Sequence, residues 1–222
     1  MAARKKALYS EIDAYIERLF QSRDRALAQT LKDSDKAGLP KISVSPNLGR
    51  ILYLLARIAN AKRILEVGLL GGYSTIWLAR AVPEDGKVIS LELEEKHAEV
   101  AARNLERAGV GSKVSIRLGP ALDSLNAMTK AHEAPFDVVF IDADKSSYPA
   151  YLERVLKLTR SGSLIIADNV IRNGRVLEKS KDPDLVAIQK FNRLLAANPK
   201  LEGILLPIVR ENIDGLAIAR VK

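Results

Sequence analysis

From residue 62 onward, short apolar runs rich in Val and Ile alternate with longer segments whose apolar residues recur at helical spacing. This alternation is typical of parallel β-strands joined by crossover helices, because parallel strands need a long connection. The runs predicted to form strands are 63–67, 87–93, 113–118, 136–141 and 163–167. The predicted helices between them are 73–81, 94–108, 121–131 and 149–158, with Gly86, Gly109 and Gly162 as stop and turn residues.

After the fifth predicted strand the pattern changes. A polar loop, 171–184, leads into one more helix, and two strands, 201–208 and 215–221, then follow with a short turn that contains Asn212 and Asp214. Two strands so close together are expected to form an antiparallel hairpin at the sheet edge. We therefore predict an α/β fold with a Rossmann-like, doubly wound sheet of seven mostly parallel strands and a reversed final strand.

The first 60 residues are predicted to add helices at 8–20, 22–36 and 46–58, packed against that sheet. With 222 residues in all, one domain is expected, made of the helical segment 1–60 and the core 61–222. No apolar run approaches the ~20 residues that cross a bilayer, and no apolar stretch follows the basic start as in a secretory signal. Since there is also no Cys, a soluble cytoplasmic protein is the expectation.

The positive charge is concentrated in the leading segment. The net charge is +8, and residues 1–63 contain thirteen Lys or Arg against six acidic residues. A basic segment can bind a nucleic acid or a phosphorylated substrate. We favour a solvated helical surface, because no aromatic or Gly-rich interleaving accompanies the charge, and so do not expect a nucleic acid partner.

Two short runs put acidic side chains where an apolar strand ends. Asp142 and Asp144 come from FIDADK, and Asp168 and Asn169 come from IIADNV. Ligands of an open parallel sheet bind at the carboxyl ends of its strands, and oxygen donors suit a hard cation such as Mg²⁺, Ca²⁺ or Mn²⁺. Taken singly, each of these residues could instead cap the helix that follows it. Together they favour a metal site beside a nucleotide-like cofactor.

The first predicted strand runs into a glycine-rich turn, EVGLLGGYS, that opens a helix. A dinucleotide-binding turn needs G-x-G-x-x-G, but counting from Gly68 places Leu70 and Tyr73 where its second and third glycines belong. The second glycine lets the backbone approach a pyrophosphate, so its absence counts against NAD. Glycines that only allow close packing of strand and helix are the alternative at this position.

Glu92 ends the second predicted strand, about twenty residues past the turn. An acidic side chain there can accept hydrogen bonds from both hydroxyls of a ribose. The turn, this acid and the reversed final hairpin together favour S-adenosylmethionine over NAD.

From about Ile42 to the C-terminus, the chain resembles the cation-dependent small-molecule O-methyltransferases, which include the catechol and caffeoyl-coenzyme A O-methyltransferases. The motifs that carry the resemblance are E-x-G-x-x-x-G-Y-S from Glu66, FIDADK, ADNV and the closing DGLAIA. The resemblance implies a metal bound by Asp142, Asp168 and Asn169, with a substrate contact at Asn173. It implies a cofactor pocket lined by Val44, Glu66, Gly68, Leu69, Ser74, Glu92, Ala121, Asp142, Asp144 and Tyr151. In some relatives His-Trp stands where this chain has Ala143 and Asp144, so the local contacts of those enzymes need not apply here.

The expected chemistry follows from the donor and the metal. A methyl group on a sulfonium is electrophilic, so the protein must align an oxygen nucleophile with it and make that oxygen anionic. A hydroxyl bound to a divalent cation loses its proton more easily. Three protein ligands leave about three positions of an octahedron open, which suits the two adjacent oxygens of a catechol. Asp142 and Lys145 are the expected catalytic residues; the resemblance implies that Lys145 is the base, although its position alone equally fits a solvent-exposed lysine.

The predicted function is therefore methylation of a vicinal hydroxyl of a phenolic or catechol-like small molecule. Three alternatives stay open: the same chemistry on a hydroxylated tRNA base, a binding protein that has lost turnover, and an NAD-dependent oxidoreductase. The resemblance also favours a homodimer. His97 and His132 are expected to be uninvolved and Trp77 to lie in the core, while the leading helices and the loop 171–184 are expected to set selectivity.

Overall fold

A computed structural model describes residues 2–20, 24–209 and 213–222. Its centre is a seven-stranded sheet in the order β3-β2-β1-β4-β5-β7-β6. The strands are β1 (Arg63–Val67), β2 (Lys87–Glu92), β3 (Val114–Leu118), β4 (Phe136–Ile141), β5 (Thr159–Ala167), β6 (Leu201–Val209) and β7 (Ile213–Val221). Strand β7 pairs antiparallel with both neighbours, and the other pairings are parallel. The predicted Rossmann-like sheet with one reversed final strand is confirmed.

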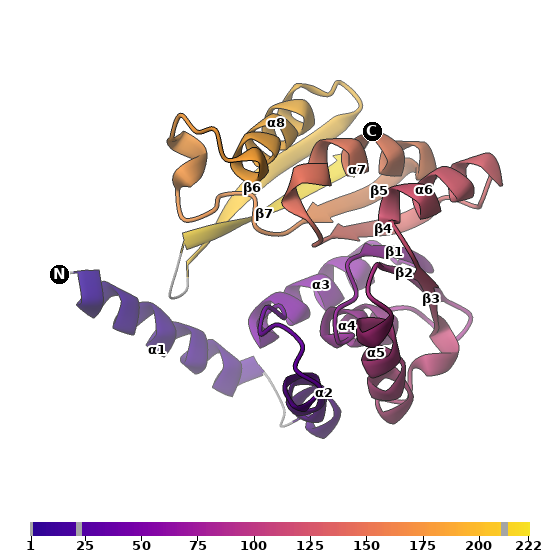
Figure 1. Ribbon diagram of the computed structural model, residues 1–222, viewed down its shortest axis with the longest axis horizontal. Coiled ribbons are helices and arrows are strands. Elements are labelled where there is room, and N and C mark those ends of the chain that lie inside the picture. Colours follow the sequence, from indigo (N-terminus) through magenta and orange to yellow (C-terminus); the bar gives the residue numbers. More distant parts are fainter. Residues whose placement is uncertain (1, 21–23, 210–212) are drawn as a thin grey trace.

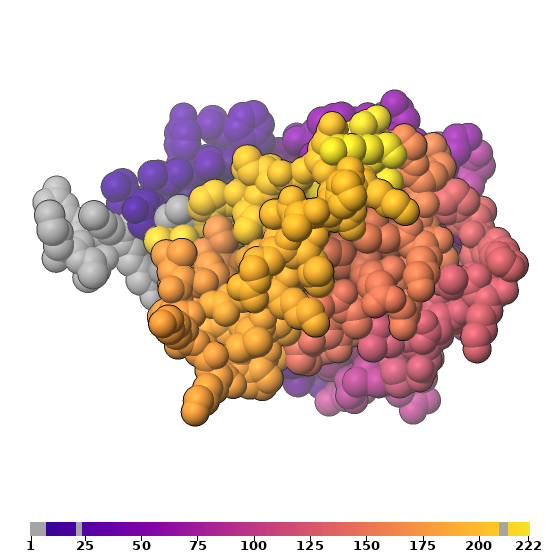
Figure 2. Space-filling model, turned by 90° about the horizontal axis from the view of Figure 1, so that it is seen from above, coloured from indigo at the N-terminus to yellow at the C-terminus, as the bar shows by residue number. Residues whose placement is uncertain are grey.

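Helices cover both faces of this sheet (Figure 1). One face carries α3 (Pro46–Ile58), α4 (Tyr73–Ala81) and α5 (Glu95–Arg107); the other carries α6 (Ala121–Lys130), α7 (Tyr148–Val155) and α8 (Pro183–Ala197). Successive residues of a strand point to opposite faces, so Ile64 belongs to the first layer's core and Leu65 to the second. Because both faces are covered, β1 and β4 are buried along almost their whole length. Figure 2 shows the outer side of the second layer.

The leading helices are α1 (Ala2–Phe20) and α2 (Arg25–Lys36). The helix α1 extends from the body and reaches α3, where Asn47 Nδ2 donates to the carbonyl of Asp13 at 3.1 Å (Figure 1). The Asp24 carboxylate caps α2 by accepting from the backbone N–H of Leu27 at 3.0 Å. The predicted start of this helix at residue 22 lies outside the described residues.

Several predicted boundaries differ from the structure. The first helix, predicted from residue 8, begins at Ala2. Strand β5 begins at Thr159, four residues before the predicted start, because Gly162 lies within the strand at φ +91° instead of ending the preceding segment. The helix predicted over 149–158 splits into α7 and a 3₁₀ turn, Leu156–Leu158. In the final hairpin, Asn212 of the predicted turn lies outside the described residues.

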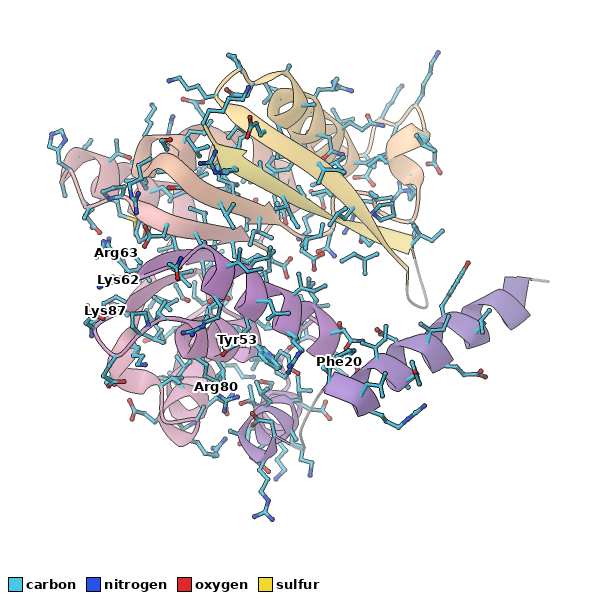
Figure 3. The ribbon with its side chains drawn as sticks, turned by 180° about the vertical axis from the view of Figure 1, so that it is seen from behind. Phe20, Tyr53, Lys62, Arg63, Arg80 and Lys87 are labelled. Atoms are coloured by element: carbon cyan, nitrogen blue, oxygen red, sulfur yellow. The ribbon has the colours of Figure 1, made fainter. Side chains whose placement is uncertain are left out.

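The edge of the sheet opposite the carboxyl ends of its parallel strands is basic. Lys62, Arg63 and Lys87 lie there, at the start of β1 and β2 (Figure 3). Lys62 Nζ pairs with Asp85 at 3.1 Å, and Lys87 Nζ donates to the carbonyl of Ser112 at 2.8 Å. These partners are consistent with a solvated surface. No helix in the described ranges is both long and apolar enough to cross a membrane.

Candidate active site

The carboxyl ends of β1, β2 and β4 open into a cleft of about 970 Å³. Ligand pockets commonly measure ~300–1,000 Å³, so this cleft has room for more than one small molecule. The predicted cofactor residues that line it are Val44, Gly68, Leu69, Ser74, Glu92, Ala121, Asp142, Asp144 and Tyr151. Lys145 and Asn169 line the same cleft. Sequence reasoning therefore brought together residues from segments far apart in the chain.

Glu66 is the one predicted cofactor residue that does not reach the wall of the cleft. Its side chain is fully buried in β1 and accepts hydrogen bonds from Ser74 and Thr75, each at 2.6 Å, and from Ser90. Burial raises the pKa of the Glu66 carboxyl to about 7, against the opposing effect of the three hydroxyl donors. Glu66 thus lies behind Ser74, which does line the cleft.

The glycines of the turn after β1 allow close packing of the backbone. A Cβ on Gly68 would lie 2.1 Å from the carbonyl oxygen of Asp142, and Gly68 has φ +100°. A Cβ on Gly71 would lie 2.1 Å from Ser34 Oγ of α2. The structure therefore supports the packing alternative for these glycines, and the cofactor prediction depends on the cleft rather than on the turn alone.

Glu92 holds the turn in place. Its Oε2 accepts from the backbone N–H groups of Leu69 at 3.2 Å and Leu70 at 2.8 Å, while Oε1 accepts from the two residues that follow it. A carboxylate has about four acceptor positions, so ribose hydroxyls would have to share them or displace these donors. His97, expected to be uninvolved, lines the cleft with its Nδ1 3.4 Å from Glu92 Oε1.

The three predicted metal ligands lie at the ends of the adjacent strands β4 and β5. Burial, together with the negative charge of Asp142, raises the pKa of Asp168 to about 7. Two neighbouring carboxylates repel each other, and a cation bound between them would relieve that repulsion. Within the described residues, no three His, Cys, Asp or Glu side chains are grouped to hold a metal. In the predicted set of ligands the third oxygen is that of the Asn169 amide.

Lys145 is held between Asp142 and Tyr148, a tyrosine that was not predicted from the sequence. Its Nζ donates to Asp142 Oδ1 at 2.8 Å and to the hydroxyl of Tyr148 at 2.9 Å. The Tyr148 hydroxyl lies 3.0 Å from the backbone carbonyl of Asp168, to which it donates. Burial keeps the pKa of Tyr148 well above its usual value, so the hydroxyl stays protonated. The available signal was the i, i+3 spacing from Lys145, which places both side chains on one side of a helical turn.

Asp144, two residues past Asp142, is hydrogen-bonded to the second tyrosine of α7, Tyr151. The Tyr151 hydroxyl donates to Asp144 Oδ1, and Ser146 Oγ donates to Asp144 Oδ2 at 3.2 Å. Burial and the neighbouring carboxylate raise the pKa of Tyr151. Trp77, as predicted, lies in the core between α3 and α4.

The loop after β5 differs from the prediction at one position. Asn173 is exposed and does not line the cleft, whereas Arg172 beside it does. Asn169, Arg172 and Asn173 have φ values of +60°, +54° and +56°. Asp214 at the start of β7 holds this loop, because its Oδ1 accepts from the backbone N–H of Arg172 at 2.9 Å. Neither role was predicted from the sequence.

Comparison with known proteins identifies close relatives. A family model described as O-methyltransferase matches residues 19–222. The catechol O-methyltransferase of Niastella koreensis is 46% identical over 217 residues, covering 97% of this chain and 98% of that protein. That of Mycobacterium tuberculosis is 45% identical over 96% of each chain. Among solved structures, the O-methyltransferase from Bacillus cereus in complex with SAH has a TM-score of 0.95 and 44% identity, covering 97% of this chain and 99% of that chain.

Proposed function

The chain belongs to the O-methyltransferase family, and on this premise we propose that it methylates one hydroxyl of a catechol-like small molecule. The methyl donor is S-adenosylmethionine, and a divalent cation such as Mg²⁺ is required. The proposal depends above all on one observation: Asp142, Asp168 and Asn169 follow two neighbouring strands, at or beside the cleft that contains the predicted donor-binding residues.

The donor set suits a hard cation. Asp142 and Asp168 offer carboxylate oxygens, and Asn169 Nδ2 is turned toward Asp214 at 3.3 Å, which leaves its amide oxygen available. The Oδ1 atom of Asp142 accepts the hydrogen bond from Lys145, which leaves Oδ2 for the cation. A divalent cation held by these residues would lower the pKa of a bound hydroxyl and favour its ionised form.

Lys145 is the proposed base. Its side chain is only 11% exposed, and its Nζ has two protein partners, Asp142 and Tyr148. Both partners fix the position of the nitrogen at the wall of the cleft, where it can take the proton of a substrate hydroxyl. The wall formed by Leu69, Ser74 and Glu92 is the proposed site of the methyl donor, whose sulfonium supplies an electrophilic methyl group.

The proposed substrate class is supported by the chemistry of the site and by the two similar proteins that are named for catechol. Two adjacent hydroxyls let a substrate contact the cation while one of them faces Lys145. The basic leading segment does not favour the tRNA alternative, because some of its charge is paired with acidic residues, as Lys41 is with Asp35 at 2.8 Å and Lys62 with Asp85 at 3.1 Å.

We also propose that the protein works as a homodimer through an apolar surface. This surface consists of exposed side chains on three elements: Leu8, Ile12, Tyr15, Ile16, Leu19 and Phe20 of α1, Ile51, Leu54 and Ile58 of α3, and Ile204, Leu206 and Ile213 of the hairpin. Figure 3 shows α1, with Phe20 at its end nearest the body, projecting from the rest of the chain. A large exposed apolar surface commonly marks an interface. A cytoplasmic location stays a prediction, which cell fractionation would check.

The test is a turnover assay with labelled S-adenosylmethionine across simple catechols, acyl-coenzyme A phenolics and tRNA. Methylation of catechols, abolished by EDTA and restored by Mg²⁺, is the expected result. Turnover that is indifferent to chelation would contradict the metal requirement. Methylation of tRNA alone would replace the proposed substrate with the alternative one.

A further inference from the structure

Arg172 is a positively charged residue of the cleft wall. Across the parts of the chain that the structure describes, its guanidinium makes no hydrogen bond and no ion pair. By contrast, Arg175 of the same loop pairs with Asp182 at 3.1 Å and with Glu178 at 3.6 Å. A half-buried guanidinium with unused donors is a binding group for an anion, because it is always charged and offers up to five N–H donors.

The backbone at Arg172 is fixed in a conformation that does not suit arginine. Its φ of +54° lies in the left-handed region, which Gly and Asn adopt more easily than residues with long side chains. Asp214 supports this conformation by accepting from the backbone N–H groups of Arg172 at 2.9 Å and Ile171 at 3.1 Å. An arginine held at such a position points to a use for its side chain.

Arg172 lies on the same side of the cleft as the proposed metal ligands. Its backbone N–H donates to Asp214 at 2.9 Å, and the same carboxylate accepts from Asn169 Nδ2 at 3.3 Å. Asp184 in the first turn of α8 is a further acidic residue of the cleft wall, but no ion pair joins it to Arg172. Among the residues that the structure describes, the Arg172 guanidinium thus keeps its N–H donors unpaired.

We propose that Arg172 is a specificity residue that binds a carboxylate carried by the catechol substrate, away from its two hydroxyls. Guanidinium and carboxylate pair through two parallel hydrogen bonds, which fix orientation as well as supply attraction. The substrate would then be held at both ends, with its diol at Asp142 and Lys145 and its carboxylate at Arg172. This inference rests on the proposed function and names its substrate class.

The experiment compares three catechols of nearly the same shape: 3,4-dihydroxybenzoate, 3,4-dihydroxybenzamide and 3,4-dihydroxybenzylamine. The measured quantity is the ratio of kcat/KM for the acid to that for the amide. The wild-type protein is expected to prefer the acid, and Arg172→Gln to lower the ratio about tenfold to a hundredfold, the usual effect of losing a charged hydrogen bond. Arg172→Lys should restore part of it, since Lys keeps the charge without the fork.

Arg175→Gln is the matched control, because Arg175 belongs to the same loop but is not part of the cleft wall. It should leave the ratio at the wild-type value. An unchanged ratio in Arg172→Gln, or a wild-type preference for the amine, would overturn the inference while methyl transfer itself upholds the proposed function. Absence of methyl transfer to all three catechols, with Mg²⁺ present, would overturn both.

Discussion

Asn169 Nδ2 donates a hydrogen bond of 3.3 Å to Asp214 Oδ2, across the gap between the end of β5 and the start of β7. The other oxygen of Asp214 accepts from three backbone N–H groups, those of Ile171, Arg172 and Gly215. One carboxylate therefore orients a proposed metal ligand and holds the loop that contains Arg172. The reversed final strand thus reaches the site through Asp214, and its Ile213 and Gly215 carbonyls also accept from the loop.

Replacing Asp214 with Ala is expected to weaken cation binding. Loss of the hydrogen bond frees the Asn169 amide to rotate, and groups that orient a metal ligand commonly contribute about 10–100-fold to metal affinity. Titration with Mn²⁺ followed by electron paramagnetic resonance measures this directly and needs no turnover. Asp214→Asn keeps the shape and should fall between Ala and wild type.

Asp182→Ala is the control for this experiment. Asp182 also accepts two backbone N–H bonds, as the N-cap of α8, but it does not line the cleft. It should leave Mn²⁺ affinity unchanged even where it destabilises the helix. Equal loss of affinity in both variants would mean that Asp214 acts only through general stability.

Much of the fold could be predicted because its signals are local. β1 and β4 were predicted at their observed bounds, since most residues of a buried parallel strand are apolar. The start of β5 was missed because Gly162 is a turn residue in most contexts, whereas here Thr159 and Leu164 on either side of it both pair with β4, across a shift in register. A pairing between distant segments leaves no mark in the local pattern.

In the candidate site, too, residues with a local signal were predicted and residues that depend on distant contacts were missed. Asp142, Asp168 and Asn169 were predicted because each follows an apolar run, and the strand order makes those ends adjacent. Tyr148 and Asp214 were missed because their roles depend on contacts between separate elements, such as the hydroxyl of Tyr148 with the carbonyl of Asp168. Glu66 was expected in the cleft wall, but the alternation of strand side chains turns it behind Ser74.

Replacing Lys145 with Ala is expected to slow turnover far more than it weakens donor binding. A positioned base contributes about 10²–10⁴-fold to rate, whereas the proposed donor site lies along Leu69 and Glu92. Single-turnover rates and calorimetry with the donor product measure the two effects separately. Lys157→Ala removes an exposed lysine from the 3₁₀ turn that follows α7. It should change neither the rate nor donor binding. Equal losses of rate and binding in Lys145→Ala would contradict the base assignment.

Replacing Leu19 with Glu is expected to dissociate the proposed homodimer. Leu19 is 56% exposed, and it continues the face of α1 that contains Leu8, Ile12 and Tyr15 at helical spacing. A charge on an apolar interface carries a desolvation cost that no partner offsets. Sedimentation equilibrium should show dimers for wild type and monomers for the variant. Leu177→Glu changes an exposed leucine outside the apolar surface and should remain dimeric; a monomeric wild type would exclude this interface.

Replacing Glu66 with Gln is expected to change how stability depends on pH. Burial raises the pKa of Glu66 from 4.5 to about 7 in the folded protein. The folded state therefore holds a proton that the unfolded state releases between these values, so the free energy of unfolding falls as pH rises from 4.5 to 7. A shift of this size corresponds to about 3 kcal/mol.

The glutamine variant cannot ionise, so it should lack that decline, and its stability relative to wild type should rise by about 3 kcal/mol across the same window. The raised pKa of Asp168 acts in the same direction, but Asp168 is present in both proteins and cancels in the difference. Urea denaturation at pH 4.5, 5.5, 6.5 and 7.5 measures both curves. Because Ser74, Thr75 and Ser90 can rotate their hydroxyls to meet an amide, the fold should tolerate the change. If stability changed with pH in the same way in both proteins, Glu66 would already be ionised at pH 4.5. Its three hydroxyl donors would then lower its pKa by more than burial raises it.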